Sequence, residues 1–180
     1  MPATDRRRAK GRRSGGTFTS LPHHIFRPSG GKPAPASALS TSARCLLVDL
    51  CHQYTGSNNG NLAASPKTLE PYGWRSSGTV DDALVECVAL GFLQQTKQGG
   101  RNRRSLYAVT WRGIDEGPHD AKPDPVPSNL WKPESAHLRD EAFIRRWQAA
   151  QQRRRGQNAS RYTDKPSRYS DKSASLRAVT

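Results

Sequence analysis

The sequence predicts one small α+β domain, mainly helical, within residues 39–111, with long basic segments on either side of it. Only 33% of the 180 residues are hydrophobic, and these concentrate between residues 39 and 111. One small core is therefore expected. Within that stretch, apolar residues recur twice with the period of an α-helix. Two short strand-like stretches joined by a glycine turn follow the second helical pattern.

Residues 1–38 are expected to form a disordered basic arm, because they are rich in Arg, Gly, Ser, Pro and Ala and too polar to bury much surface. One apolar cluster, residues 21–26, either clips onto the domain or is a short interruption of the disorder. The arginine-rich run near the start resembles arms that track phosphates or enter a minor groove. Its candidate DNA-binding residues are Arg6, Arg7, Arg8, Lys10, Arg12 and Arg13.

The first predicted helix carries a single apolar stripe and has a hydroxyl residue at position 40, 41 or 42 to cap its start. The stripe consists of Ala43, Leu46, Leu47, Leu50 and Tyr54. The glycine- and asparagine-rich residues 56–60 end this helix, and residues 61–64 are a candidate short strand. Ser65 and Pro66 then begin a short second helix, about residues 66–70, which Pro71 ends.

The third predicted helix starts at Ser77 or at Thr79, and Thr79 would form a capping box with Asp82. Its buried face consists of Val80, Ala83, Leu84, Cys87 and Val88. Gly91 ends it. A strand over residues 92–97, a basic turn over 98–104 and a second strand over 105–111 complete the domain, and Gly99-Gly100 permits the reversal.

This order of elements resembles the winged helix-turn-helix family over residues 39–111. The shared features are a short helix opened by Ser-Pro, an amphipathic helix ending in Ala-Leu-Gly-Phe-Leu, and a Gly-Gly-Arg turn between strands. Residues 41–50 (Thr-Ser-Ala-Arg-Cys-Leu-Leu-Val-Asp-Leu), 58–62 (Asn-Asn-Gly-Asn-Leu) and 107–116 (Tyr-Ala-Val-Thr-Trp-Arg-Gly-Ile-Asp-Glu) are further similar to small winged-helix proteins of bacterial plasmids, prophages and integrative elements.

The resemblance implies that the third helix is the recognition helix in a DNA major groove and that the turn, or wing, lies on the adjacent backbone. The implied base-facing residues are Arg75, Ser76, Ser77, Thr79 and Asp82. The wing candidates are Lys97, Gly99, Gly100, Arg101, Asn102, Arg103 and Arg104, because arginine pairs with phosphate and glycine allows close backbone approach.

Acidic residues on the third helix conflict with this assignment. Asp81, Asp82 and Glu86 would repel phosphates, and the helix has no Lys or Arg. Asp82 is acceptable as a residue at the positive end of the helix, whereas Glu86 is too far along for that explanation. The alternative is that this acidic face packs against a basic protein partner.

The carboxyl-terminal third is expected to be less ordered. Residues 112–136 contain many prolines and little periodicity, which indicates a linker. Residues 137–153 have the apolar spacing of a second amphipathic helix, either docked on the core or open to a second copy of the chain or another protein. Residues 154–180 are expected to form a disordered tail.

Charge and residue inventory narrow the function. The net charge is +14, carried mainly outside the predicted domain, which favours a polyanionic partner. The three cysteines have no metal-ligand spacing and are expected to be small buried residues, as in a reducing compartment. The protein is therefore expected in the cytoplasm, associated with the nucleoid when it binds DNA. No catalytic constellation, cofactor motif, signal peptide or membrane span is evident, so neither an enzyme nor a membrane protein is expected.

These observations lead to a hypothesis of double-stranded DNA binding by a winged helix, with transcriptional regulation as its first use. Plasmid or phage replication, where such a domain marks an origin, is an alternative within the same binding class. A protein-interaction role for the acidic face of the third helix is the alternative from a different class.

Overall fold

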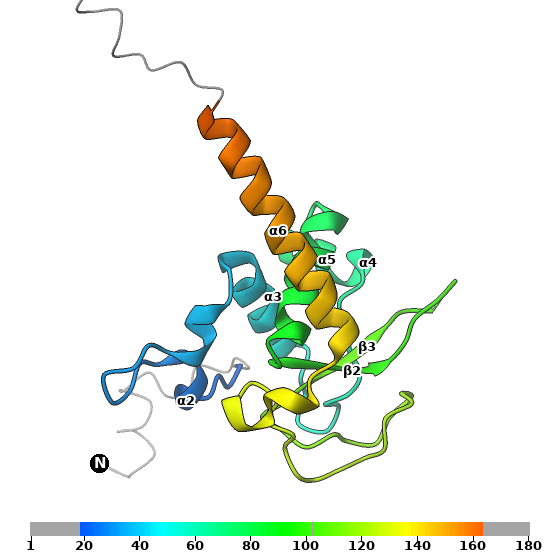
Figure 1. The fold of residues 1–180 in the computed structure, drawn as a ribbon. Helices are drawn as coiled ribbons and strands as arrows, with labels where there is room; N and C mark the ends of the chain where they lie inside the picture. Colours follow the sequence, from blue (N-terminus) through cyan, green and yellow to red (C-terminus); the bar gives the residue numbers. More distant parts are fainter. Residues whose placement is uncertain (1–18, 102, 164–180) are drawn as a thin grey trace, which may run out of the picture.

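The computed structural model describes residues 19–101 and 103–163, with side chains described as far as residue 157. It is an α+β structure in which helices pack on one face of a small antiparallel sheet (Figure 1). In chain order the central elements are α3 (Thr41–His52), β1 (Leu62–Ala63), α4 (Pro66–Leu69), α5 (Ser77–Ala89), β2 (Leu93–Lys97) and β3 (Leu106–Val109).

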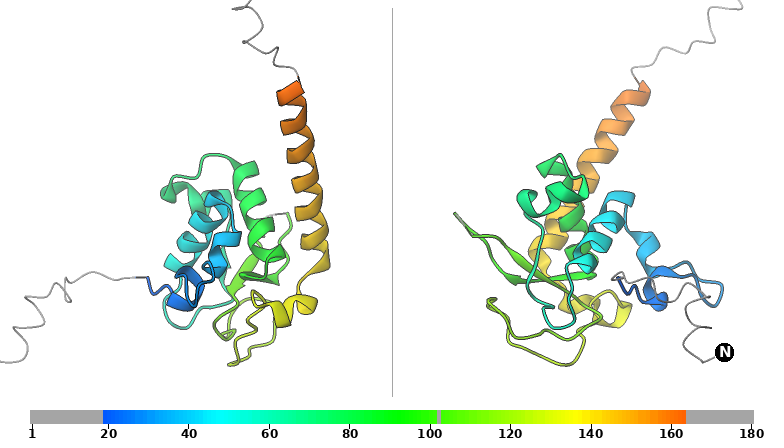
Figure 2. Two further views of the ribbon diagram at one scale, coloured as in Figure 1. Left: turned by 60° about the vertical axis from the view of Figure 1, so that its left-hand side comes forward. Right: turned by 180° about the vertical axis from the view of Figure 1, so that it is seen from behind.

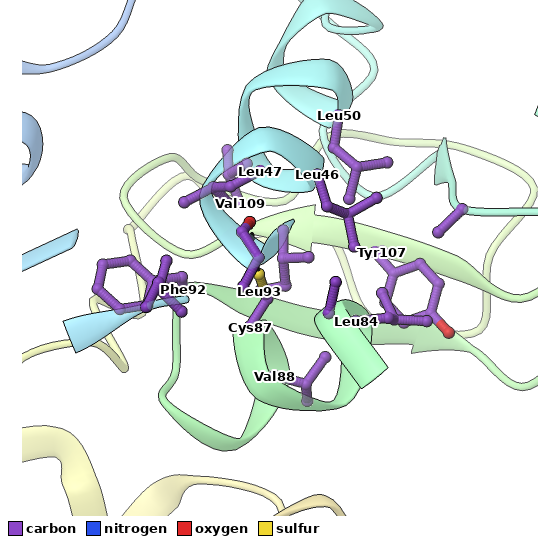
Figure 3. Close-up of a cluster of buried hydrophobic side chains, with 14 of the residues drawn as sticks. Leu46, Leu47, Leu50, Leu84, Cys87, Val88, Phe92, Leu93, Tyr107 and Val109 are labelled. Atoms are coloured by element: carbon purple, nitrogen blue, oxygen red, sulfur yellow. Dashed lines mark hydrogen bonds between the residues drawn. The ribbon is translucent and has the colours of Figure 1, made fainter. Parts of the chain in front are cut away.

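Helices α3 and α5 form the core together with the sheet. The hydroxyl of Ser40 accepts a hydrogen bond from the N–H of Ala43 at 3.3 Å and so caps α3. Four of the five predicted stripe residues lie on α3 and are buried, whereas Tyr54 follows the end of the helix and is half-buried. Figure 3 shows the leucines of α3 facing the buried side of α5 and the strands. The labelled core residues are Leu46, Leu47, Leu50, Leu84, Cys87, Val88, Phe92, Leu93, Tyr107 and Val109.

The three strands lie in the order β1-β3-β2, all antiparallel. Leu62 pairs with Tyr107 and Leu93 with Val109, and a bulge interrupts β2 between Gln95 and Lys97. The strands are shorter than the predicted 92–97 and 105–111. Just beyond the two strands, the N–H of Thr110 still donates to the Phe92 carbonyl at 3.2 Å, and the Thr110 hydroxyl donates to the Gly91 carbonyl at 2.7 Å.

The second helical region is longer than predicted. Ser65 caps α4 with its hydroxyl accepting from the N–H of Thr68 at 3.3 Å, but Pro71 does not end the helical turn. Instead a 3-10 turn, η2 (Glu70–Tyr72), continues to Gly73, whose φ of 91° supplies the left-handed stop. Proline is tolerated there because it lies in the first turn of η2, where its missing N–H has no helical partner.

Part of the amino-terminal arm packs onto the domain. Residues 21–26 include the short helix α2 (His23–Phe26), and Ile25 is fully buried, which corresponds to the clip alternative. Residues 27–38 were expected to lack regular structure. In the structure two backbone hydrogen bonds join Ser29 and Lys32, and a 3-10 turn, η1 (Pro35–Ala38), buries Ala36.

Residues 112–136 are not a free linker. Ile114 and Asp124 exchange backbone hydrogen bonds of 2.7 and 3.0 Å, and the N–H of Asn129 donates to the carbonyl of Thr110 at 2.7 Å. Leu130 is 8% exposed and lies against the end of α5 at Gly91, where a β-carbon would meet the Leu130 carbonyl oxygen at 2.2 Å. These contacts use distant backbone groups, so local periodicity could not reveal them.

The carboxyl-terminal helix is longer and starts later than the predicted 137–153. A 3-10 turn, η3 (Pro133–Leu138), leads to Asp140, whose carboxylate accepts from the N–H groups of Ala142 and Phe143 and caps α6 (Glu141–Thr163). Residues 154–163, expected in a disordered tail, continue this helix. Figures 1 and 2 show α6 lying along α5 and then extending beyond it; residues 164–180 lie outside the described part.

Candidate nucleic-acid interface

The start of α5 is an open, hydroxyl-rich surface. Ser76 is the N-cap, with its hydroxyl accepting from the N–H of Thr79 at 3.3 Å, in place of the predicted caps Ser77 and Thr79. The cap lies one residue earlier because Ser76 has the extended backbone that an N-cap requires, whereas Ser77 is already helical. Arg75, Ser76, Ser77 and Thr79 are all exposed. The structure thus brings four of the five predicted base-facing residues together in one turn.

The turn before α5 is fixed to the core. The indole N–H of Trp74 donates to the Asp49 carboxylate on α3 at 2.7 Å. This charged hydrogen bond, with the left-handed Gly73, sets the path of the chain into α5. Arg75 and Ser76 therefore project from a braced turn.

The two aspartates of α5 are neutralised by α6. Arg146 donates to both carboxylate oxygens of Asp81, at 3.1 and 3.0 Å, and Arg154 donates to Asp82 at 2.8 Å. Both pairs are about half exposed. Asp82 is thus an ion-pair partner of α6 in this structure, and it does not form the predicted capping box with Thr79.

Glu86 is not on the surface of α5. It is 5% exposed, and its carboxylate accepts from the backbone N–H of Ser40 at 2.8 Å and from the Ser40 hydroxyl at 2.6 Å. The charge lies at the amino terminus of α3, where the helix dipole favours an anion. The expectation that Glu86 repels phosphates is therefore wrong, because its carboxylate is buried and accepts hydrogen bonds from the start of α3.

Helix α6 also covers much of α5 sterically. It runs antiparallel to α5. Asp140, just before α6, lines a pocket with Val88 near the end of α5, whereas Arg154, further along α6, donates to Asp82 near the start of α5. Phe143 is 8% exposed and Trp147 is half-buried against the core. Every α5 residue from 83 to 89 is buried. Only the first turn and the flanking aspartates of α5 reach the surface.

The turn between β2 and β3 is a narrow basic hairpin. Gly100 and Arg103 exchange backbone hydrogen bonds of 3.0 Å, and the N–H of Gly99 donates to the Ser105 hydroxyl at 2.9 Å. A β-carbon on Gly99 would meet the Ser105 nitrogen at 2.6 Å, so only glycine fits at this position. Arg101, Arg103 and Arg104 are exposed, and the hairpin projects from the body of the molecule (Figure 1).

Lys97 is held differently from the three arginines. Its ammonium donates to the Pro118 carbonyl at 2.7 Å and lies 3.9 Å from the Asp120 carboxylate. The packed segment 112–136 thus holds this lysine at the base of the hairpin. Of the predicted wing cations, the arginines are the ones that reach outward.

Some predicted residues lie outside the described part of the chain. These are Asn102 at the hairpin tip and the arm residues Arg6, Arg7, Arg8, Lys10, Arg12 and Arg13. Conversely, sequence patterns missed the roles of Arg146 and Arg154. The available signal was an unexplained acidic pair on one helix and an arginine-rich helix further along the chain.

The cysteines are not alike. Burial raises the pKa of Cys51 to about 12 and that of Cys87 well above its ordinary value, whereas Cys45 is exposed, contrary to expectation. It is exposed because it lies beside the apolar stripe of α3. Among the described residues there is no cluster of three or more potential metal ligands. None of the described helices has both the length and the apolar character needed to cross a membrane.

Comparison with family models, with curated proteins and with solved structures finds no match for this chain.

Proposed function

We propose that the protein binds double-stranded DNA through a winged-helix arrangement. The order α3, α4, α5, β2, β3 follows the order of elements on which the resemblance to that family rests. The observation that carries the proposal is the hairpin turn: three exposed arginines and no acidic residue lie between residues 98 and 105. Arginine side chains on a narrow hairpin suit phosphate contact or minor-groove entry.

In the proposed complex α5 approaches the duplex with its first turn. Ser77 and Thr79 can meet base edges, Arg75 can meet a base or a phosphate, and the free N–H groups of the helix start favour a phosphate. Asp82 is not proposed to read a base, because its carboxylate is paired with Arg154. Full insertion of α5 along a major groove is not part of the proposal, since α6 covers the remaining surface.

The ion pairs of α6 remove the main objection to DNA binding. Asp81 and Asp82 would weaken phosphate contact if unpaired, at about 1 kcal/mol for each close pair in water. Their pairing with Arg146 and Arg154 offsets that repulsion. The same contacts argue against the protein-interaction alternative, because the basic partner of this acidic face is a helix of the same chain. We propose regulation of transcription as the use of this binding.

The test is the salt dependence of duplex binding by the variant Arg101→Ala/Arg103→Ala/Arg104→Ala. If the hairpin contacts phosphates, the affinity falls, and the slope of log K against log salt decreases by up to about three. The measurement is fluorescence anisotropy with a labelled duplex at several salt concentrations.

The matched control is Arg27→Ala/Lys122→Ala/Arg145→Ala, which removes three exposed cations elsewhere on the described surface. It lowers the net charge equally, so it separates local contact from general attraction. Equal salt slopes for the wild type and the hairpin variant would overturn the proposal. Equal losses of duplex affinity in the hairpin variant and the control variant would also overturn it.

A further inference from the structure

Helix α6 is much longer than its contact with α5. The docked part runs from Phe143, packed on the core, to Arg154, paired with Asp82 in the early part of α5. Nine residues, 155–163, follow Arg154 in the same helix. At 1.5 Å per residue they extend about 13 Å further. Packing on the domain does not account for this length.

Residues 153–163, the free half of α6, begin in the last docked turn and are basic: they include four arginines and no acidic residue. From residue 142 to 163 the sequence has six arginines and no acidic residue. Arg145 pairs with Glu141, Arg146 with Asp81 and Arg154 with Asp82. Arg153 and Arg155 are exposed and form no ion pair with any described residue. Neighbouring helical residues differ by 100°, so these two side chains flank the Arg154 contact on opposite sides.

The direction of α6 places this charge beside the proposed DNA surface. Because α6 is antiparallel to α5, its free half passes the end of α5 that carries Ser77. Figures 1 and 2 show that the free half of α6 and the β2–β3 hairpin project from the body on either side of the α4–α5 corner. Two basic projections thus flank the hydroxyl-rich first turn of α5.

We infer that the free half of α6, beginning at Arg153, is a second phosphate-binding arm that holds the same duplex on the side opposite the hairpin. This inference rests on the proposed function. A helix with several like charges and no acid is weakened by repulsion, and backbone phosphates relieve that repulsion. Because these contacts are to phosphates, they add affinity and orientation and do not read sequence.

The experiment compares duplex binding of the wild type with that of Arg153→Gln/Arg155→Gln across salt concentrations. Two lost phosphate contacts reduce the slope of log K against log salt by up to about two. Arg27→Gln/Arg145→Gln removes the same charge and includes an arginine of the docked part of α6, so its slope is expected to stay closer to that of the wild type. Equal slopes for Arg153→Gln/Arg155→Gln and wild type overturn the inference.

A second measurement locates the arm directly. Gln157 is exposed and uncharged, and Gln157→Cys in a Cys45→Ser background gives one accessible thiol, because Cys51 and Cys87 are buried. An iron chelate attached there is expected to cleave a bound duplex at positions outside those that the hairpin protects. Absence of cleavage by a variant that still binds overturns the inference.

The two proposals fail in different ways. Wild-type protein that does not bind the duplex overturns both. Binding that depends on Arg101, Arg103 and Arg104 but not on Arg153 and Arg155 overturns only the arm. Binding of single-stranded RNA in preference to the duplex, with both sets of arginines required, overturns the DNA assignment for both surfaces.

Discussion

At the scale of single residues, Glu86 links two helices through a buried carboxylate. It is the only described acidic residue in the buried class, and it satisfies two donors of Ser40 at the start of α3. Glu86→Ala is expected to lower the free energy of unfolding by about 2 kcal/mol, because two hydrogen bonds to a buried charged group are lost. Urea denaturation measures this change.

The control for Glu86 is Glu141→Ala. Glu141 also belongs to a helix and contacts an arginine at 3.3 Å, but its side chain is 82% exposed. Its loss is expected to change stability by about 0.5 kcal/mol or less. Similar effects for the two variants would contradict the bridging role of Glu86.

The cysteines provide a second test at this scale. Thiolate is the reactive form, and burial raises the pKa of Cys51 and Cys87 while also blocking access. A thiol reagent at pH 8 is therefore expected to modify Cys45 quickly in the native protein, and Cys51 and Cys87 only on unfolding. Mass spectrometry of the modified peptides gives the count, and rapid modification of all three would contradict the buried placement.

At the scale of elements, α6 is held mainly by apolar packing. Phe143 is 8% exposed, whereas the Arg146–Asp81 pair is about half exposed and screened by water. Phe143→Ala is expected to weaken docking of α6 by about 3 kcal/mol, and Arg146→Gln by less than about 1 kcal/mol. Hydrogen exchange of the α6 amides measures both effects. A larger effect of Arg146→Gln would mean that charge holds the helix.

Local periodicity predicted the elements whose residues contact neighbours in the same helix or hairpin. The stripe of α3 and the inward face of α5 follow from spacing, and the hairpin over β2 and β3 follows from the Gly99-Gly100 turn and the alternation of the second strand. Asn59 shows the limit. Its side-chain oxygen accepts from the N–H of Val109, and its NH2 group donates to the carbonyls of Val109, Arg112 and Gly113. The sequence indicated only a turn residue at this position.

The candidate site was predictable to a similar extent. The exposed first turn of α5 and the arginine hairpin were found from residue types and order. The pairing of Asp81 and Asp82 was not, because their partners lie 65 and 72 residues further along the chain. The docking of residues 112–136 was missed for the same reason: proline-rich composition indicates the absence of regular structure but not of packing.

At the scale of the whole molecule, basic residues are separated by role. Some arginines neutralise acids of α5, and others remain available on two projections beside one corner of the domain. A domain of this size gives few specific contacts by itself, so the projections are expected to supply much of the affinity. Binding that falls steeply with salt is the overall property that this distribution predicts.

Duplex binding by the first turn of α5 and the β2–β3 hairpin can be tested by mapping amide chemical shifts of the labelled protein during titration with a DNA duplex. The largest changes are expected at residues 75–79 and 97–104, with weaker changes near residue 153 and beyond. Changes confined to the α2 side of the molecule, or to segments other than the first turn of α5 and the β2–β3 hairpin, would contradict it.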